Sequence, residues 1–201
     1  MDPSDAFAAR VEAALAEGRW DLATQARLEW LEAAPETSGG AQAGYQAALA
    51  LLFGGQGDQA LERLRQVART KVSPWAAMAR TSMGLVLLRL GKPQQGMFEL
   101  RKAAADAGLV GAQAQALLAD ALMDSNKGAE AEKARDVLCE QLRACASLPD
   151  PDGAYARLWL GMEYKRNGMR AEARRELEAA IASGALPDAE RRVAEDALTE
   201  L

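Results

Sequence analysis

The chain has no histidine and only two cysteines among its 201 residues. The lack of histidine removes the Ser-His and Cys-His nucleophile pairs and the commonest metal-binding side chain. β-Branched residues are also scarce, with 1 Ile, 7 Val and 5 Thr against 45 Ala and 27 Leu. Since Ala and Leu favour helices and β-branched residues favour strands, the composition predicts an all-α fold.

Long apolar runs are absent as well. The longest, Ala47 to Phe53, is far shorter than the roughly 20 residues that span a bilayer. Met1 to Asp5 has no basic region followed by an apolar one, so we expect no secretory signal, no membrane partner and a cytoplasmic location. Cys139 and Cys145 would lie about 9 Å apart along one helix, beyond disulfide reach, and are expected to be small core residues.

Charge gives no sign of a nucleic-acid partner. The formal net charge is −5, and charged residues make up 26% of the chain. The densest basic group, residues 165–175, is interleaved with Glu172 and Glu176. Mixed charges of this kind are typical of an exposed helix face, so we expect both glutamates to face outward and no nucleic acid to bind.

An internal repeat of about 36 residues organises the chain. Its turn positions are separated by 37, 36, 35 and 42 residues, and they are Gly18, Gly55, Gly91, Asn126 and Gly168. Glycine and asparagine accept the left-handed backbone that ends a helix, so each turn is predicted to join two antiparallel helices. The weaker copies are the first and the fourth.

Small residues recur on both helices of each predicted pair. Gly84 and Gly161 lie on first helices, and Gly96 and Ala173 lie on the following second helices. Large side chains at both places would push the helix axes beyond their usual separation of about 8–10 Å. The pattern therefore predicts close helical hairpins.

The fifth copy follows the pattern of one known family. It has L-G-x-x-Y at Leu160-Gly161 and Tyr164, and the A of the later A-x-x-x at Ala173. With this pattern the chain resembles the tetratricopeptide repeat (TPR) proteins. The resemblance implies a right-handed α-solenoid of antiparallel helix pairs that forms a single domain over residues 1–201; a related helical-hairpin solenoid stays open. Its repeats would cover roughly residues 4–36, 41–74, 76–110, 112–149 and 152–187, followed by a capping helix at 188–201.

Two copies depart from the family pattern. In the fourth repeat the second helix phases better from Ala134 than from Ala131, and we expect the extra length in the Asp124–Gly128 turn and the Leu148–Asp152 link. In the first repeat Trp30 stands where the family has alanine. It either caps the open end of the core or displaces the neighbouring helix.

Motifs of catalysis are missing. The sequence has no Walker loop, G-x-S-x-G, H-E-x-x-H or paired C-x-x-C. The Gly-rich stretch at residues 53–58 lacks the lysine and the preceding strand of a phosphate-binding loop. We therefore expect no enzyme activity and no cofactor or metal.

The resemblance implies a partner-binding groove lined by the first helix of each repeat. Some family members hold a peptide's C-terminal carboxylate with Lys, Asn and Arg at such positions, but that pattern is absent here. The groove residues carried over by register are Tyr45, Leu49, Leu52, Phe53, Met78, Leu85, Arg89, Asp120, Met123, Leu158, Met162, Lys165 and Arg166.

Most of these residues are apolar, although any of them could belong to the core instead. They favour an adaptor or scaffold that binds a protein or peptide segment with an apolar stripe, the charged residues setting its orientation. The alternatives are a small cytosolic secretion-type chaperone that shields apolar segments of exported subunits, and a structural module that associates with itself.

Overall fold

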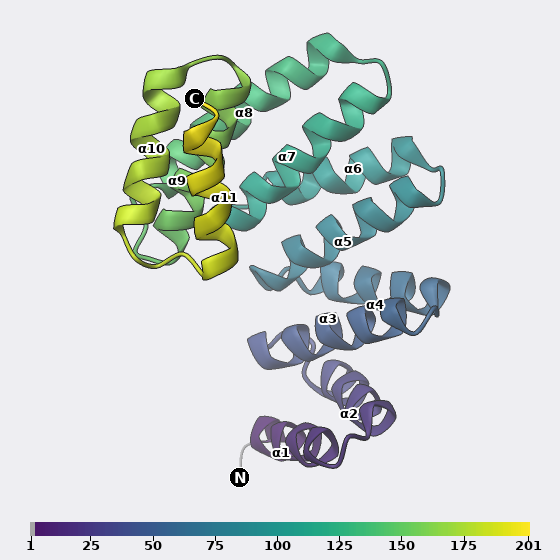
Figure 1. Ribbon diagram of the computed structural model, residues 1–201. Helices are drawn as coiled ribbons and strands as arrows, with labels where there is room; N and C mark the ends of the chain where they lie inside the picture. Colours follow the sequence, from purple (N-terminus) through teal and green to yellow (C-terminus); the bar gives the residue numbers. More distant parts are fainter. Residues whose placement is uncertain (1–2) are drawn as a thin grey trace. The chain divides into compact units, whose positions relative to one another are not determined.

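The computed structural model describes residues 3–201, and over these residues the chain forms eleven α-helices and no strand. Within each of two units, consecutive helices pack against one another as antiparallel hairpins (Figure 1). The predicted all-α solenoid of helix pairs is thus confirmed. The chain divides into two compact units, Met1–Asp106 and Ala107–Leu201, named here the N-terminal and C-terminal units.

The N-terminal unit contains three hairpins. Its helices are α1 (Pro3–Ala16), α2 (Trp20–Ala33), α3 (Ser38–Phe53), α4 (Gly57–Thr70), α5 (Trp75–Arg89) and α6 (Pro93–Ala104). The C-terminal unit contains two hairpins and a last helix. Its helices are α7 (Leu109–Asp124), α8 (Gly128–Cys145), α9 (Asp152–Arg166), α10 (Arg170–Ala182) and α11 (Asp188–Thr199).

The turn inside each hairpin has a left-handed residue, as predicted. The φ angles of Gly18, Gly55, Gly91 and Gly168 lie between 69° and 75°, and that of Asn126 is 58°. Only three residues separate the two helices at each of these turns. One left-handed residue per turn therefore fixes where each first helix ends and its partner begins.

Close approach of the paired helices depends on residues without a side chain. A Cβ atom added to Gly161 would lie 2.7 Å from Cγ of Leu177 on α10. In the N-terminal unit, a Cβ atom on Gly84 would lie 2.7 Å from Cγ of Leu100, and one on Gly96 would lie 2.9 Å from the carbonyl oxygen of Gly84. The predicted role of these glycines is confirmed, and the leucine of the second helix is the group that fills the space.

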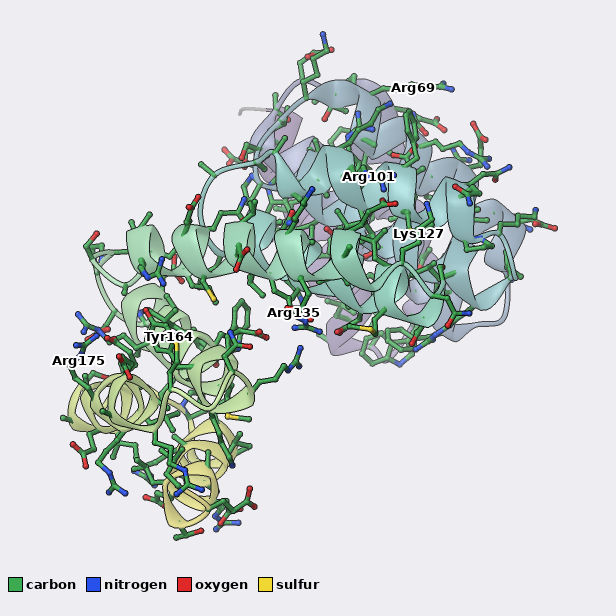
Figure 2. The ribbon with its side chains drawn as sticks, turned by 90° about the horizontal axis from the view of Figure 1, so that it is seen from above. Arg69, Arg101, Lys127, Arg135, Tyr164 and Arg175 are labelled. Atoms are coloured by element: carbon green, nitrogen blue, oxygen red, sulfur yellow. The ribbon has the colours of Figure 1, made fainter. Side chains whose placement is uncertain are left out.

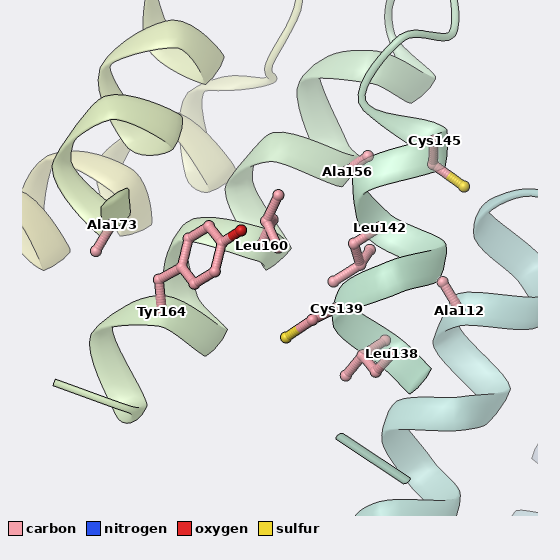
Figure 3. Packing of buried hydrophobic residues seen from close by; sticks show 9 residues of the cluster. All are labelled: Ala112, Leu138, Cys139, Leu142, Cys145, Ala156, Leu160, Tyr164 and Ala173. Atoms are coloured by element: carbon pink, nitrogen blue, oxygen red, sulfur yellow. The ribbon is translucent and has the colours of Figure 1, made fainter. Parts of the chain in front are cut away.

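The core of the C-terminal unit continues from one hairpin into the next. Figure 3 shows its cluster of buried residues: Leu138, Cys139, Leu142 and Cys145 from α8 pack with Ala156, Leu160 and Tyr164 from α9, Ala112 from α7 and Ala173 from α10. Both cysteines are buried and free, as expected. This packing of α8 against α9 positions the site described below.

The fourth repeat carries its extra length in its second helix and in the link that follows. The turn before α8 is as short as the others, whereas α8 has 18 residues and the second helices of the other hairpins have 12 to 14. Ala131 and Ala134 are both buried, so the buried face of α8 includes both of the residues from which the helix was phased. The expected lengthening of the Asp124–Gly128 turn was wrong, because apolar residues at Leu138, Leu142 and Cys145 extend the buried face of α8 instead. The expected extra length in the link before Asp152 is confirmed, since six residues separate α8 from α9 and four separate the other hairpins.

Trp30 of α2 lies between the two neighbouring first helices. Its ring stacks on Phe7 of α1 with centroids 6.1 Å apart. A Cβ atom on Gly39 of α3 would lie 2.6 Å from Cζ2 of the indole. The missing side chain at Gly39 provides the room that this large residue needs.

The helix α11 packs on α9 and α10. Ala194 and Ala197 are buried there together with Leu177 and Leu186, whereas Val193 is 48% exposed. Among residues 3–201, no helix is long and apolar enough to cross a membrane.

We predict that Gly161→Ala destabilises the C-terminal unit by about 1–3 kcal/mol, because the added methyl group overpacks the space held by Leu177. Urea unfolding followed by circular dichroism would measure the change. Gly57→Ala is the matched control: nothing lies within 4 Å of its added Cβ atom, so its stability should stay unchanged or rise slightly. Equal midpoints for the two variants would contradict the close approach.

Candidate functional site

A pocket of about 250 Å³ opens on the C-terminal unit between α7, α8 and α9. We call it the C-terminal pocket. Its lining residues are Gln113, Ala116, Leu117 and Asp120 from α7, Arg135, Leu138 and Leu142 from α8, and Trp159, Met162, Glu163 and Arg166 from α9.

Apolar side chains form the base of this pocket. Leu138 and Leu142 are fully buried in the core, and Trp159 packs against the same cluster while remaining partly exposed. Met162 is 38% exposed at the edge. An apolar side chain from another molecule could therefore enter and contact Trp159 and Met162 without any rearrangement of the core.

A buried arginine occupies one side of the pocket. Arg135 is only 8% exposed, and its Nη1 donates to both carboxylate oxygens of Glu163, at 3.0 and 3.1 Å. Its Nη2 donates to Oδ1 of Asp120 at 2.5 Å. In Figure 2, Arg135 extends from α8 on the side where α9 lies. The guanidinium thus joins all three helices that line the pocket.

Glu163 is the buried carboxylate of this network, with 8% of its surface exposed. Burial raises the pKa of Glu163, because desolvation disfavours its charged form, and Arg135 offsets part of that effect. Arg166 lies 3.7 Å from the same carboxylate and is half-exposed. The network therefore presents exposed charges of both signs, Asp120 and Arg166, at the pocket edge.

Of the groove residues expected on the C-terminal unit, Asp120, Met162 and Arg166 line this pocket together. Met123 is 45% exposed but does not line it. Lys165 instead pairs with Glu200, Nζ to Oε2 at 2.5 Å. The expectation for Leu158 was wrong: it is 3% exposed, since it packs with Leu177 and Leu186 under α11.

The expected groove residues of the N-terminal unit lie on α3 and α5. Tyr45 is partly buried, with its hydroxyl 3.2 Å from Oγ of Ser82 and its ring 6.1 Å from that of Trp75. Leu52 packs against the core of this unit. Leu49, Met78 and Leu85 are also partly buried, whereas Phe53 is 90% exposed and Arg89 is exposed. Whether they contact a partner stays a prediction.

The outward orientation expected for Glu176 was wrong. Glu176 is 9% exposed and accepts hydrogen bonds from Arg175 at 2.8 and 3.1 Å, with Nη1 of Arg157 3.9 Å away. Two arginines thus compensate its charge where α9 and α10 meet. Glu172 is partly exposed.

Sequence reasoning missed Arg135, Glu163 and Trp159 as pocket residues. A signal for the first two was present. Arg135 directly follows Ala134 on the buried face of α8, and Glu163 directly precedes Tyr164. A charged residue within such a stretch needs a partner of opposite charge, and Arg135 and Glu163 pair with each other.

No protein-family model matches the sequence, and no curated protein matches it. Solved structures do resemble it. A MamA protein superposes with a TM-score of 0.51 and 16% identity, over 89% of this chain and 90% of that one. A Podosopora anserina putative kinesin light chain with nearly identical TPR-like repeats gives 0.51 and 18%, over 90% and 96%. The likeness establishes a TPR-like fold.

We predict that Arg135→Met destabilises the protein by about 3–5 kcal/mol, because it removes the buried cation that donates to both oxygens of the Glu163 carboxylate. The double variant Arg135→Met/Glu163→Met should recover most of that loss, since neither charge remains. Urea unfolding of both variants would measure this coupling.

Lys127→Met serves as the control for charge removal. Lys127 and Glu130 form an exposed pair at 3.6 Å, which should contribute less than about 1 kcal/mol. A loss in Arg135→Met no greater than that in Lys127→Met would show that the network adds nothing to stability.

The raised pKa of Glu163 predicts a pH dependence. Because the folded protein holds this proton more tightly than the unfolded chain, whose Glu pKa is about 4.3, the contribution of Glu163 should be largest below that pH. It should fall as the pH rises through the folded pKa. The measurement is the difference in unfolding free energy between wild type and Glu163→Gln from pH 4 to 7. A difference that grows with pH would show that Arg135 lowers this pKa instead.

Proposed function

We propose that the protein is a non-enzymatic interaction scaffold, which binds a segment of a partner protein through an apolar side chain placed in the C-terminal pocket. The observation that supports this most is the combination of an apolar base with exposed charges of both signs at one edge. The TPR-like fold suits this function, since stacked hairpins present extended binding surfaces.

The size of the pocket favours a single side chain over a small-molecule ligand. At about 250 Å³ it is smaller than the roughly 300–1,000 Å³ of typical small-molecule sites. Trp159 and Met162 offer an aromatic face and a flexible thioether, both of which adapt to apolar side chains of different shapes. Asp120 and Arg166 would then orient the segment through charges on either side of the bound residue.

The partner in this proposal is a protein or peptide segment with an apolar stripe, and no cofactor or nucleic acid takes part. The chain would work as one cytoplasmic domain of five repeats and a capping helix. The exposed groove candidates of the N-terminal unit, Phe53 and Arg89, stay a separate prediction of partner contact. Chaperoning of exported subunits and self-association are the competing functions, and the identity of the captured protein separates the three.

A photo-crosslinking amino acid in place of Met162 tests the proposal. In the native host, irradiation should give a discrete crosslink to a partner protein, because Met162 lies at the pocket edge. Mass spectrometry would identify the captured protein. One partner supports the adaptor, exported subunits support the chaperone, and the chain itself supports the self-associating module.

Val137 is the matched position for this experiment. It is 43% exposed on α8, close to the 38% of Met162, but does not line the pocket. The crosslinker at Val137 should capture no discrete partner. Equal capture from both positions, or none from Met162 in a variant that melts like wild type, would contradict binding at the C-terminal pocket.

A further inference from the structure

A second pocket, of about 280 Å³, lies on the N-terminal unit between α1, α2 and α3. We call it the N-terminal pocket. Its lining residues are Ala8, Val11 and Glu12 from α1, Arg27 and Trp30 from α2, and Gly39, Gln42, Ala43 and Gln46 from α3.

The two pockets have the same construction. Arg27 lies nine residues after the left-handed Gly18, and Arg135 lies nine residues after the left-handed Asn126. On the following first helix, the lining residues 39, 42, 43 and 46 repeat the spacing of 159, 162, 163 and 166. In this alignment Arg27 is the counterpart of Arg135, and Ala43 stands where Glu163 stands.

The carboxylate that neutralises the arginine in one pocket is therefore absent from the other. Glu163 accepts two hydrogen bonds from Arg135, whereas Ala43 has no acceptor in its side chain. Within the described residues Arg27 forms neither an ion pair nor a side-chain hydrogen bond. Its Nε is buried without an acceptor, and burial lowers the pKa of this arginine.

Trp30 adds a second donor to the same pocket. Its indole Nε1 is also buried without an acceptor, one helical turn after Arg27 on α2. Gln42 and Gln46 line the opposite side, on α3. Both nitrogens lie beneath the pocket surface, so an acceptor in the pocket would pair with the terminal nitrogens of Arg27, which are not buried.

Glu12 is the one lining carboxylate, and it does not fill this role. Glu12 lies six residues before Gly18, as Asp120 lies six residues before Asn126, so the two carboxylates are counterparts. Asp120 pairs with Arg135 at 2.5 Å, whereas Glu12 makes no such pair with Arg27. The nearby Glu29 pairs with Arg10, at 2.7 Å. Neither glutamate therefore occupies the guanidinium of Arg27.

We propose that the N-terminal pocket binds a carboxylate group of a partner polypeptide, which pairs with the guanidinium of Arg27 beside Trp30, in the place that Glu163 fills in the C-terminal pocket. This inference deepens the proposed function, since it names a group that the bound segment carries. It uses second-helix residues and is independent of the first-helix positions considered from the sequence.

Small probes test the pocket without the partner. The full chain is labelled with ¹⁵N, and the Trp30 Nε1–H and Arg27 Nε–H signals are followed, identified by their loss in Trp30→Phe and Arg27→Gln. N-acetyl-glutamate amide carries only a side-chain carboxylate, N-acetyl-glutamine carries only a main-chain carboxylate, and N-acetyl-glutamine amide carries neither. At matched ionic strength, at least one carboxylate probe should shift both signals with saturation, and the neutral probe should not. The probe that binds more tightly identifies the source as an acidic side chain or a chain terminus.

Three variants define the outcome, read from the Trp30 signal. Arg27→Gln should weaken binding of the carboxylate probe at least tenfold, whereas Arg19→Gln, which removes an exposed charge at the start of α2, should leave it unchanged. Glu12→Gln should strengthen binding severalfold, because it removes a competing negative charge. Equal shifts with the neutral probe, no saturable shift, or equal loss in Arg19→Gln and Arg27→Gln would overturn the proposal. Crosslinking at Met162 is unaffected by these results, so the proposed function can stand or fail separately.

Discussion

The structure depends on how closely the two helices of each hairpin approach. At Gly84 and Gly161 the first helix has no side chain, and a leucine of the second helix fills the space left by the missing Cβ. Within each unit, the hairpins then pack in sequence, each second helix against the first helix of the next hairpin. Small residues in the hairpins and leucines between them leave pockets where a second helix meets two first helices. Both pockets described above have that location.

Charge within these pockets distinguishes one from the other. The guanidinium of Arg135 is compensated by two carboxylates, so the C-terminal pocket can accept an apolar side chain without a further charge. The guanidinium of Arg27 has no such compensation, and an unpaired buried donor typically costs about 1–3 kcal/mol. The arginine at this position is thus paired in one hairpin and unpaired in the other, because Ala43 stands where Glu163 stands and Glu12 does not pair with Arg27 as Asp120 pairs with Arg135.

Much of the fold could be predicted from sequence because its determinants are local. A left-handed residue at each turn and a small residue at each crossing are visible as glycine, asparagine or alanine at a fixed period. The site was less predictable, because pairing between helices depends on register. Leu158 and Glu176 lie at positions that the repeat assigns to surfaces, but α11 covers the first and two arginines enclose the second. Nothing in the period reveals that Lys165 pairs with Glu200.

The 18-residue length of α8 makes the fourth hairpin non-interchangeable with the others. Glu163 lies five residues before the left-handed Gly168, and the residue five before the left-handed Gly55 on α3 is Ala50. In the pocket alignment, however, the counterpart of Glu163 is Ala43, seven residues earlier on α3. The longer α8 and the longer link between α8 and α9 together account for most of this shift, which changes the side chains that face each other. A chimaera that replaced α8 with the 14-residue α2 would keep every residue of α9 and place Arg27 at the position of Arg135, but the shorter helix would no longer bring Glu163 against that arginine. Repeat averaging, as used to derive consensus sequences, would erase this pairing while retaining the fold.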